Sequence, residues 1–444
     1  MGAHPEIRFV LIARRSWLTA ALGACLLLSP ASGQEGDPPR QFVERVEIST
    51  QARTRSDVVE RYLSLTVGAP LHSEDLLTGR QRLSDTGFFK SVDVYARPGS
   101  AKGLVVVVVE IEEHRWPQYR FQGGHGEFDG WYLAPIGFVY DNFAGHGHRL
   151  DWESYTAIHN DGDNLHYQHP YLHSGAAILD VDLFSQDRSF PHFINGRKTQ
   201  ETVSTRGFSL RFTGQHGRLQ NLYSQLRLQS YRPEANARLD TLLHEDLQRA
   251  RVLALGVGLQ ADTRDRPGFP TQGFWGRAIV EHALDAGAGN VTFTKITLDG
   301  RWYRALDGNN IVAVRAYGGL ATDGAPFYQR FYLGGQYSLR GFEWAELTPV
   351  GWGTRTLQLQ SELRFPFGKQ ESAGPRHTAV VYYDAGGIWR AGEIPLVTDL
   401  HHSVGLGYRR RLRVLGMLRL DLAFPVNGFD SDTSLLSLSL GHTF

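Results

Sequence analysis

The 444-residue chain carries 46 basic and 46 acidic side chains, so its formal net charge is zero and gives no electrostatic basis for binding nucleic acid. Beyond the N-terminal region, no apolar run approaches the length of a membrane-spanning helix. This does not exclude a membrane protein, because closed β-barrels also satisfy every backbone polar group. The 49 glycines and 24 phenylalanines favour that class.

The N-terminus is predicted to be a signal peptide spanning residues 1–33. Basic residues up to Arg15 precede the apolar segment Trp17–Leu28, and the small residues Ala31–Gly33 offer a cleavage site. Cys25 loosely resembles the modified cysteine of a lipoprotein, but the three leucines after it and the short apolar segment before it argue against lipidation. Because Cys25 is the only cysteine, the mature protein is expected to lack disulfides and thiolate chemistry.

Residues 41–114 are predicted to form one small α/β domain. The expected elements, in chain order, are a strand at Val43–Ser49, a helix at Asp57–Ser64 with Ser56 as its N-cap, a helix at Ser73–Asp85, and a hairpin of strands Phe88–Tyr95 and Leu104–Ile111. This order, with Leu83 and Phe88 closing the core, resembles a POTRA domain. Such modules bind extended polypeptide at an exposed sheet edge, and a rigid spacer is the alternative role.

Residues 116–444 show a persistent alternation of apolar and polar side chains. Strict alternation places one set of side chains on each face of a strand. Clear examples are Leu179–Leu183, Phe208–Phe212, Leu222–Gln229 and Leu418–Phe424. A soluble sandwich would also alternate, but with its polar face outside and with more regular Gly/Pro turns. We therefore predict a transmembrane β-barrel with an apolar exterior and a polar lumen.

The spacing of turn signals predicts about 16 antiparallel strands, at about 20 residues per strand and connection. Tight turns are predicted at Asp307-Gly308 and Asn427-Gly428, and long loops at Phe190–Thr202 and Pro233–Glu245. Short turns on one rim and long loops on the other are typical of membrane barrels.

The last predicted strand runs to the end of the chain, with Leu436, Leu438 and Leu440 on its outward face. Gly441 and Phe444 complete this segment. Any closing strand can end in phenylalanine, but an aromatic residue at the terminus resembles the C-terminal signal of outer-membrane barrels.

The stretch Arg330–Phe342 lies between two predicted strands and is too long for a tight hairpin and too apolar for a solvated loop. Two acids on later strands are candidate partners for its cation Arg340. Alternation along Leu357–Phe365 turns Glu362 into the lumen, and a lipid-facing carboxylate at Asp384 would be costly. We predict that the loop folds into the barrel and that Arg340 bridges Glu362 and Asp384 by charge-assisted hydrogen bonds.

Several motifs resemble the BamA/TamA-like superfamily of POTRA barrels. Phe331–Gly335 followed by Leu339, Arg340, Gly341 and Phe342 is similar to the sixth-loop motif of that family. Tyr382 and Asp384 resemble its aromatic-x-Asp pair on a late strand, and Glu362 matches its strand glutamate. The family's turn signature is matched by Asp262, Arg264, Asp265, Pro270 and Gly273, and a recurrent early turn is matched by Asn142–Gly147.

The resemblance implies that Leu339–Phe342, with Glu362, Tyr382 and Asp384, forms a latch that pins the loop inside the barrel; we call these residues the loop latch. It also implies a seam between the first and last strands that opens laterally, where a client strand pairs its backbone before meeting lipid. The expected location is the bacterial outer membrane, with the POTRA domain in the periplasm. The expected partners are unfolded or exported polypeptides, outer-membrane lipid and a periplasmic accessory protein, without nucleic acid or a cofactor.

The expected function is insertion or assembly of β-barrel proteins, or translocation of polypeptides across the outer membrane, and insertion is favoured. A two-partner-secretion pore is the main alternative, but it would be expected to carry two POTRA domains and an N-terminal plug helix, for which Gln34–Arg40 is too short. A passive porin would not need the latch. Neither the 18 histidines nor the serines form a metal or nucleophile motif, so enzymatic activity, including lipid hydrolysis, is not expected. The family's insertases carry several POTRA domains where this chain has room for one, which leaves membership of a large assembly complex open.

Overall fold

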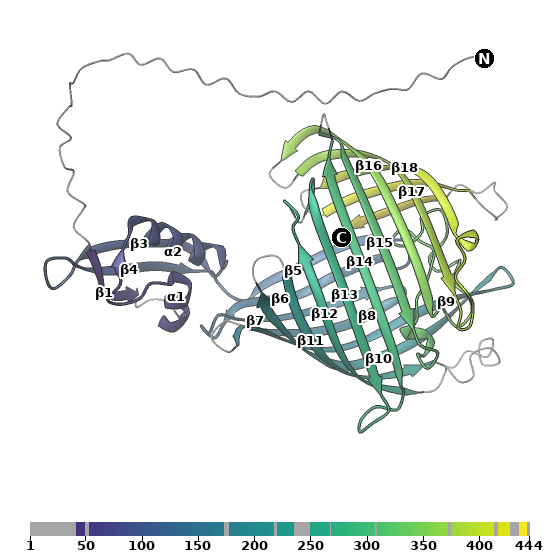
Figure 1. Ribbon diagram of the computed structural model, residues 1–444, viewed down its shortest axis with the longest axis horizontal. Coiled ribbons are helices and arrows are strands. Elements are labelled where there is room, and N and C mark those ends of the chain that lie inside the picture. The colour runs from purple at the N-terminus through teal and green to yellow at the C-terminus, as the bar shows by residue number, and fades with distance from the viewer. Residues whose placement is uncertain are drawn as a thin grey trace, which may run out of the picture.

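The computed structural model describes residues 41–48, 53–172, 177–216, 220–234, 249–266, 268–306, 309–371, 374–412, 416–426 and 435–441. It consists of a four-stranded sheet with two helices, followed by a closed barrel of sixteen strands, β5 to β20 (Figure 1). The predicted number of strands is confirmed. The predicted signal peptide with Cys25, the turns at Asp307-Gly308 and Asn427-Gly428, and Phe444 lie outside the described residues. No helix within the described ranges has the length and hydrophobicity to cross a membrane.

The N-terminal domain follows the predicted order with one added strand. Its elements are β1 (Gln41–Ile48), α1 (Ser56–Leu63), β2 (Pro70–Leu71), α2 (Ser73–Asp85), β3 (Phe89–Pro98) and β4 (Leu104–Glu113). The sheet order is β2-β1-β4-β3, with β1 parallel to β4, so β3 forms one edge. Val59, Leu63 and Leu83 from the two helices pack on Val107 and Val109 of β4.

The prediction that Ser56 caps the first helix is wrong. The helix begins at Ser56, and Arg55 occupies the cap position without a side-chain cap hydrogen bond. The Arg55 N–H instead donates to the backbone oxygen of Gly145, at 3.0 Å, in the turn between β6 and β7 of the barrel. The helix start is therefore set by a contact between the domain and the barrel, because that contact holds Arg55 extended.

The barrel strands are joined in chain order, each antiparallel to the next, and β20 closes on β5. Their bounds are β5 (Gln118–Gly126), β6 (Gly130–Phe143), β7 (His148–Ala157), β8 (Asn160–Leu172), β9 (Ala177–Ile194), β10 (Arg197–His216), β11 (Gln220–Pro233), β12 (Ala250–Asp262), β13 (Gly273–Leu284), β14 (Phe293–Ala305), β15 (Ile311–Ala321), β16 (Arg355–Glu371), β17 (Gly374–Trp389), β18 (His401–Leu412), β19 (Gly416–Pro425) and β20 (Leu435–Gly441).

The alternation seen in the sequence divides the outer from the inner face of the wall. On β16, Leu357 and Leu359 are 50% and 40% exposed, whereas Gln358 between them is 5% exposed. On β19, Phe424 is exposed while Arg419 and Asp421 are buried. Since the polar set is the buried one, the polar face points inward and the apolar face outward, as membrane barrels require.

The predicted long loop at Phe190–Thr202 is wrong. The strands β9 and β10 pair through this segment as far as Ile194 and Arg197 and are joined by a two-residue turn. Asn195 and Gly196 occupy that turn with φ of 49° and 72°, which is the backbone geometry of a tight hairpin favoured by Asn-Gly. The polar composition of the segment reflects a hairpin that extends beyond the apolar band of the wall.

The turn Asn142–Gly147, between β6 and β7, docks the N-terminal domain on one rim of the barrel, here called the domain-side rim. The Asn142 side-chain amide donates to the Thr54 hydroxyl at 2.7 Å and its carbonyl accepts from the Gly147 N–H at 2.8 Å. Nearby, the guanidinium of Arg61 lies 4.6 Å from the ring centre of Tyr171 on β8. These contacts orient the domain relative to the barrel.

Candidate functional site

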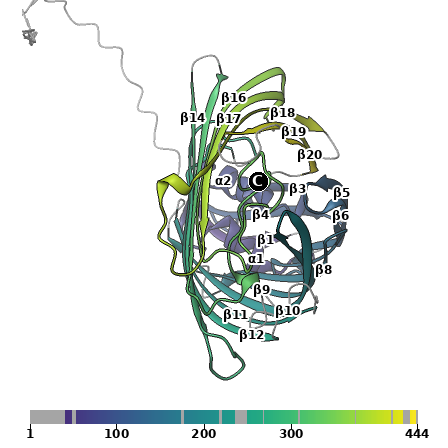
Figure 2. The same cartoon turned by 90° about the vertical axis from the view of Figure 1, so that its right-hand side faces the viewer.

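The connection between β15 and β16, residues 322–354, folds into the barrel. Figure 2 shows this green segment inside the ring of strands. Its apolar side chains form a core within the lumen, and Phe327, Leu333 and Leu339 have no exposed surface. Phe331 forms an isolated β-bridge with Gly353, which ties the two arms of the connection together. The apolar composition that is unsuited to a solvated loop is therefore explained by burial.

Arg340, within this connection, meets two acidic side chains of neighbouring strands. Its Nε and Nη2 donate to Oδ2 and Oδ1 of Asp384 on β17, both at 2.6 Å. Its Nη1 donates to Oε1 of Glu362 on β16, also at 2.6 Å. The side chains of Arg340 and Asp384 are 2% and 0% exposed. A paired, charge-assisted contact of this kind fixes both the place and the plane of the guanidinium.

Tyr382 lies on the same inward face of β17 as Asp384. The guanidinium carbon of Arg340 is 3.5 Å from the centre of the Tyr382 ring, within the range of a cation–π interaction. The Tyr382 hydroxyl has no hydrogen-bond partner among the described residues. The face of the ring, not the hydroxyl, is therefore the part of Tyr382 that Arg340 uses.

The residues beside Arg340 let the backbone approach the wall. Gly341 has a φ of 95°, and a Cβ placed on it would lie 3.3 Å from the Cβ of Ser403 on β18. Leu339 and Phe342 are buried and pack with Leu333 in a separate apolar cluster. The structure thus brings all the predicted loop-latch residues together.

Four side chains outside the predicted set extend the network. Arg364 Nε donates to Glu362 Oε2 at 2.8 Å, and Arg409 Nη2 donates to Asp421 Oδ1 at 2.7 Å. Arg419 donates both to Asp421 and, at 3.3 Å, to the backbone oxygen of Gln336 in the infolded connection. Alternation along β19 places Arg419 and Asp421 in the lumen, but their proximity to Arg340 is a property of the closed barrel.

The predicted turn signature forms the connection between β12 and β13 at the domain-side rim. Arg264 Nη2 donates to Asp262 Oδ2 at 2.7 Å. Asp265 Oδ1 accepts from the backbone N–H of Thr271 at 2.9 Å and of Gln272 at 3.2 Å. The carboxylates of Asp262 and Asp265 therefore fold the connection back on itself just before Gly273, where β13 begins. None of these contacts reaches Arg340.

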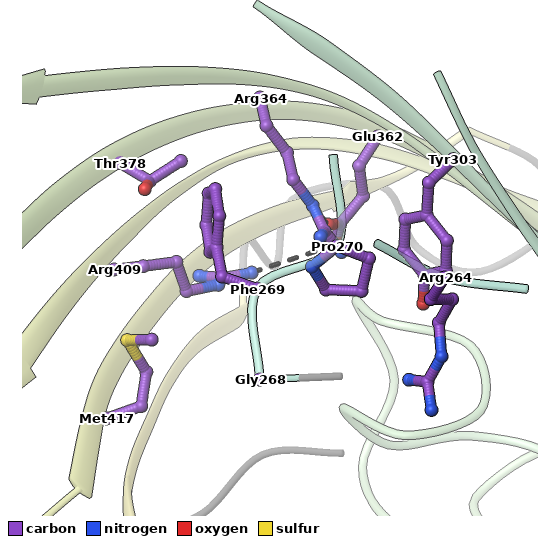
Figure 3. A pocket seen from close by; sticks show the side chains of 10 residues that line it. All are labelled: Arg264, Gly268, Phe269, Pro270, Tyr303, Glu362, Arg364, Thr378, Arg409 and Met417. Atoms are coloured by element: carbon purple, nitrogen blue, oxygen red, sulfur yellow. Dashed lines mark hydrogen bonds and ion pairs between the residues drawn. The ribbon is translucent and has the colours of Figure 1, made fainter. Parts of the chain in front are cut away.

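Phe269 and Pro270 of this connection nevertheless reach the underside of the latch. They line a cavity of about 70 Å³ together with Glu362, Arg364 and Arg409 (Figure 3). A space of that size holds a few water molecules. The Glu362 end of the latch therefore borders a cavity with room for water, whereas the Asp384 end is fully buried.

Glu127, in the turn between β5 and β6, joins the first hairpin of the barrel to the infolded connection. Its Oε2 accepts from the backbone N–H of Gln336 at 2.7 Å. Burial raises the pKa of the Glu127 carboxyl to about 7, against the opposing effect of this hydrogen bond. A turn carboxylate carries no motif, so sequence reasoning had no signal for this contact.

The seam between the first and last strands is narrow. Within the described residues, β20 pairs with β19 from Leu435 to Gly441, but its pairing with β5 is confined to Leu440 and His125. The Tyr132 hydroxyl, on β6, adds a hydrogen bond of 3.1 Å to the Leu440 oxygen. Among the described residues, most of the β20 edge that faces β5 therefore has no backbone partner.

Family models match both parts of the chain. Residues 142–444 match the Omp85 superfamily domain, and residues 42–114 match the surface antigen variable number repeat, the POTRA module. The chain belongs to the Omp85 superfamily. The predicted family is confirmed, and so is the predicted location: this Omp85 protein is an outer-membrane barrel with its POTRA domain in the periplasm, so the domain-side rim is the periplasmic rim.

Two relatives named outer membrane protein assembly factor BamA are similar to this chain. The one from Nitratidesulfovibrio vulgaris is 22% identical over 424 residues, covering 91% of this chain and 51% of the relative. The one from Neisseria meningitidis serogroup B is 21% identical over 384 residues, covering 80% of this chain and 47% of the relative. The chain therefore spans about half the length of the curated relatives it matches.

Two solved structures share this architecture. BamA from Haemophilus ducreyi lacking POTRA domains 1–3 aligns with a TM-score of 0.77 at 18% identity, over 90% of this chain and 84% of that chain. CdiB from Acinetobacter baumannii aligns with a TM-score of 0.61 at 16% identity, over 90% of this chain and 73% of that chain. At these identities the likeness shows a shared fold.

Proposed function

We propose that this Omp85 protein assists the insertion of β-barrel polypeptides into the outer membrane and that the seam between β20 and β5 is the template. The observation that carries the proposal is the narrow pairing at Leu440 and His125, compared with the full ladder between β20 and β19. An unpaired strand edge directs the addition of another strand. A client strand that pairs there satisfies its backbone groups before it enters lipid, where unpaired groups cost several kcal/mol each.

The loop latch supports this role by keeping the wall beside the seam in shape. Arg340 joins the infolded connection to β16 and β17, and Arg419 on β19 joins the same connection through Gln336. These strands lie on the β20 side of the seam. We infer that the latch holds this side as a rigid edge while the β5 side moves away.

The partners follow from the same chemistry. Clients are unfolded barrel polypeptides, recognised through backbone pairing, and the edge strand β3 of the POTRA domain offers them an earlier docking edge. A periplasmic accessory protein is a further proposed partner. Strand exchange makes and breaks no covalent bond, so we assign no enzymatic activity. The naming of the similar relatives as assembly factors supports this reading.

Polypeptide secretion is the second candidate, because the fold is shared with CdiB. The two functions make opposite demands on the barrel. Secretion needs a lumen that clears during transport, whereas insertion needs a seam that opens while the lumen stays filled.

The test is reconstitution of the full chain in phospholipid vesicles with an unfolded outer-membrane barrel as client. The variants are Arg340→Ala, a matched surface change Arg376→Ala, and a seam lock made by His125→Cys with Leu440→Cys in a Cys25→Ser background. Arg376 is exposed on β17, away from the latch. Folding of the client is followed by its resistance to protease.

Insertion predicts faster client folding with wild type and Arg376→Ala, and loss of that acceleration with Arg340→Ala and with the oxidised seam lock. Reduction of the lock should restore it. If wild type does not accelerate folding but conducts ions, and the lock has no effect, the insertion proposal fails and the secretion pore is favoured.

A further inference from the structure

The connection between β17 and β18, residues 390–400, lies on the outside of the barrel. Trp389, the last residue of β17, points outward, since it alternates with the inward Asp384 and Ile388. It is nevertheless only 6% exposed. The cover comes from the connection: Trp389 Nε1 donates to Asp399 Oδ2 at 3.1 Å. In Figure 2 this lime ribbon stands outside the wall formed by β16 and β17.

Two further contacts place the connection against the outward face. A Cβ built on Gly387, which also points outward, would lie 2.9 Å from Cδ2 of Leu400. Arg355 Nη1, at the start of β16, donates to the backbone oxygen of Glu393 at 2.6 Å. The connection therefore folds back over the ends of two strands and does not extend freely from the rim.

Three large apolar side chains of this connection are strongly exposed. Ile394, Leu396 and Val397 are 76%, 54% and 83% exposed. They flank Pro395 and the short 3-10 helix η3 (Val397–Asp399). The charged side chains of the connection, Arg390, Glu393 and Asp399, are also exposed, and the Glu393 carboxylate accepts from the Arg390 N–H at 2.7 Å. Three large apolar side chains grouped on one exposed segment mark an interaction surface.

We propose that residues 390–400 form an anchor in the outer leaflet of the membrane and that their partner is the acyl chains of outer-leaflet lipid. The argument is continuity with the lipid-facing wall. Directly below the connection, the outward side chains Leu357, Leu359 and Val381 are 50%, 40% and 47% exposed and belong to the apolar band. A short segment that exposes large apolar side chains beside charged ones is amphipathic, and such segments partition into the lipid interface.

The anchor is joined to the loop latch through the wall. The Thr354 N–H, at the end of the infolded connection, donates to the Trp389 oxygen at 2.9 Å. Ile388, on the inward side of the same strand end, packs against the cluster of Leu333, Leu339 and Phe342. Lipid bound to residues 390–400 would therefore stabilise the end of β17 that contacts the infolded connection.

Single labels test the anchor without disturbing the core. The full chain with Cys25→Ser receives one cysteine carrying an NBD fluorophore, at Val397 or at Ile394, both highly exposed. Leu359→Cys is the control for the lipid-facing wall, and Lys102→Cys, in the exposed turn between β3 and β4, is the control for water. Each protein is reconstituted in phosphatidylcholine vesicles with or without doxyl-labelled lipid, and iodide is the aqueous quencher.

The proposal expects labels at positions 397 and 394 to be quenched by doxyl lipid as strongly as the label at 359, and by iodide at least about threefold less than the label at 102. Iodide quenching at 397 and 394 equal to that at 102 would show a solvated loop and overturn the proposal. Protection from both quenchers would also overturn it, because it would show a protein partner or a second copy of this chain on this surface.

Discussion

Arg340 and Asp384 form two parallel hydrogen bonds, from Nε to Oδ2 and from Nη2 to Oδ1, each of 2.6 Å. The pair joins a connection between strands to the wall of the barrel, at a point where neither side chain is more than 2% exposed. The third side-chain hydrogen bond of Arg340, to Glu362, has the same length, and Glu362 lines a cavity of about 70 Å³. The two acids that bind the Arg340 guanidinium therefore differ in their surroundings: Asp384 is fully buried, and Glu362 lines a cavity.

Asp384→Asn is expected to destabilise the barrel more than Glu362→Gln. In the fully buried site, loss of the Asp384 charge leaves the guanidinium without its bidentate partner and costs about 3–5 kcal/mol. At Glu362, water in the adjacent cavity can replace the lost charge in part, and the cost is about 1–3 kcal/mol. Urea unfolding in vesicles, followed by tryptophan fluorescence, measures both. Equal costs, or the reverse order, would contradict this difference between the surroundings of the two acids.

Two substitutions at Tyr382 distinguish the contribution of its aromatic ring from that of its hydroxyl. Its hydroxyl has no hydrogen-bond partner among the described residues, so Tyr382→Phe should change the free energy of unfolding by no more than about 0.5 kcal/mol. Tyr382→Leu removes the aromatic face 3.5 Å from the Arg340 guanidinium carbon. It should cost about 2–3 kcal/mol, from the lost cation–π contact and poorer packing. A large effect of the phenylalanine variant would show that the hydroxyl matters.

Gly341→Ala should loosen the infolded connection. The residue has a φ of 95°, and the added Cβ would lie 3.3 Å from Ser403 and 3.4 Å from Ala423. The combined strain is expected to cost about 1–3 kcal/mol. Gly318→Ala on β15 is the matched control, because a Cβ there meets no atom within 4 Å. Protease cleavage of the connection in the folded barrel should rise in the first variant and not in the second.

Glu127 is expected to make the stability of the barrel depend on pH. Its folded-state pKa of about 7 lies above the ordinary value of 4.5, so the folded protein binds the proton more tightly than the unfolded chain does. The stabilisation is complete below about pH 4.5 and is lost as the pH rises towards 7, by up to about 3 kcal/mol. Glu127→Gln keeps an acceptor for the Gln336 N–H but removes the titration. The difference between wild type and variant, measured by urea unfolding at pH 5 and pH 8, isolates this group; identical pH dependence would refute the assignment.

Local sequence patterns predicted the barrel and the residues that meet Arg340. Alternation needs only the local geometry of a strand, so it correctly separated Gln358 from Leu357 and Leu359, and the need to keep charge out of lipid turned Asp384 inward. The apolar composition around Arg340 likewise predicted an infolded connection, because a solvated loop gains nothing from such residues. Where the local signal was misleading, as for Phe190–Thr202, the turn-forming Asn195-Gly196 pair inside the segment was the overlooked evidence.

Which side chains meet across the closed barrel depends on the three-dimensional fold. The approach of Arg409, Arg419 and Asp421 to the latch, the contact of Glu127 with Gln336, and the cover over Trp389 all join residues far apart in the chain. Such contacts depend on strand tilt, on register and on where the barrel closes, and these are set by the whole ladder together. The narrow pairing of Leu440 with His125 is of the same kind, since it exists only where the first strand meets the last.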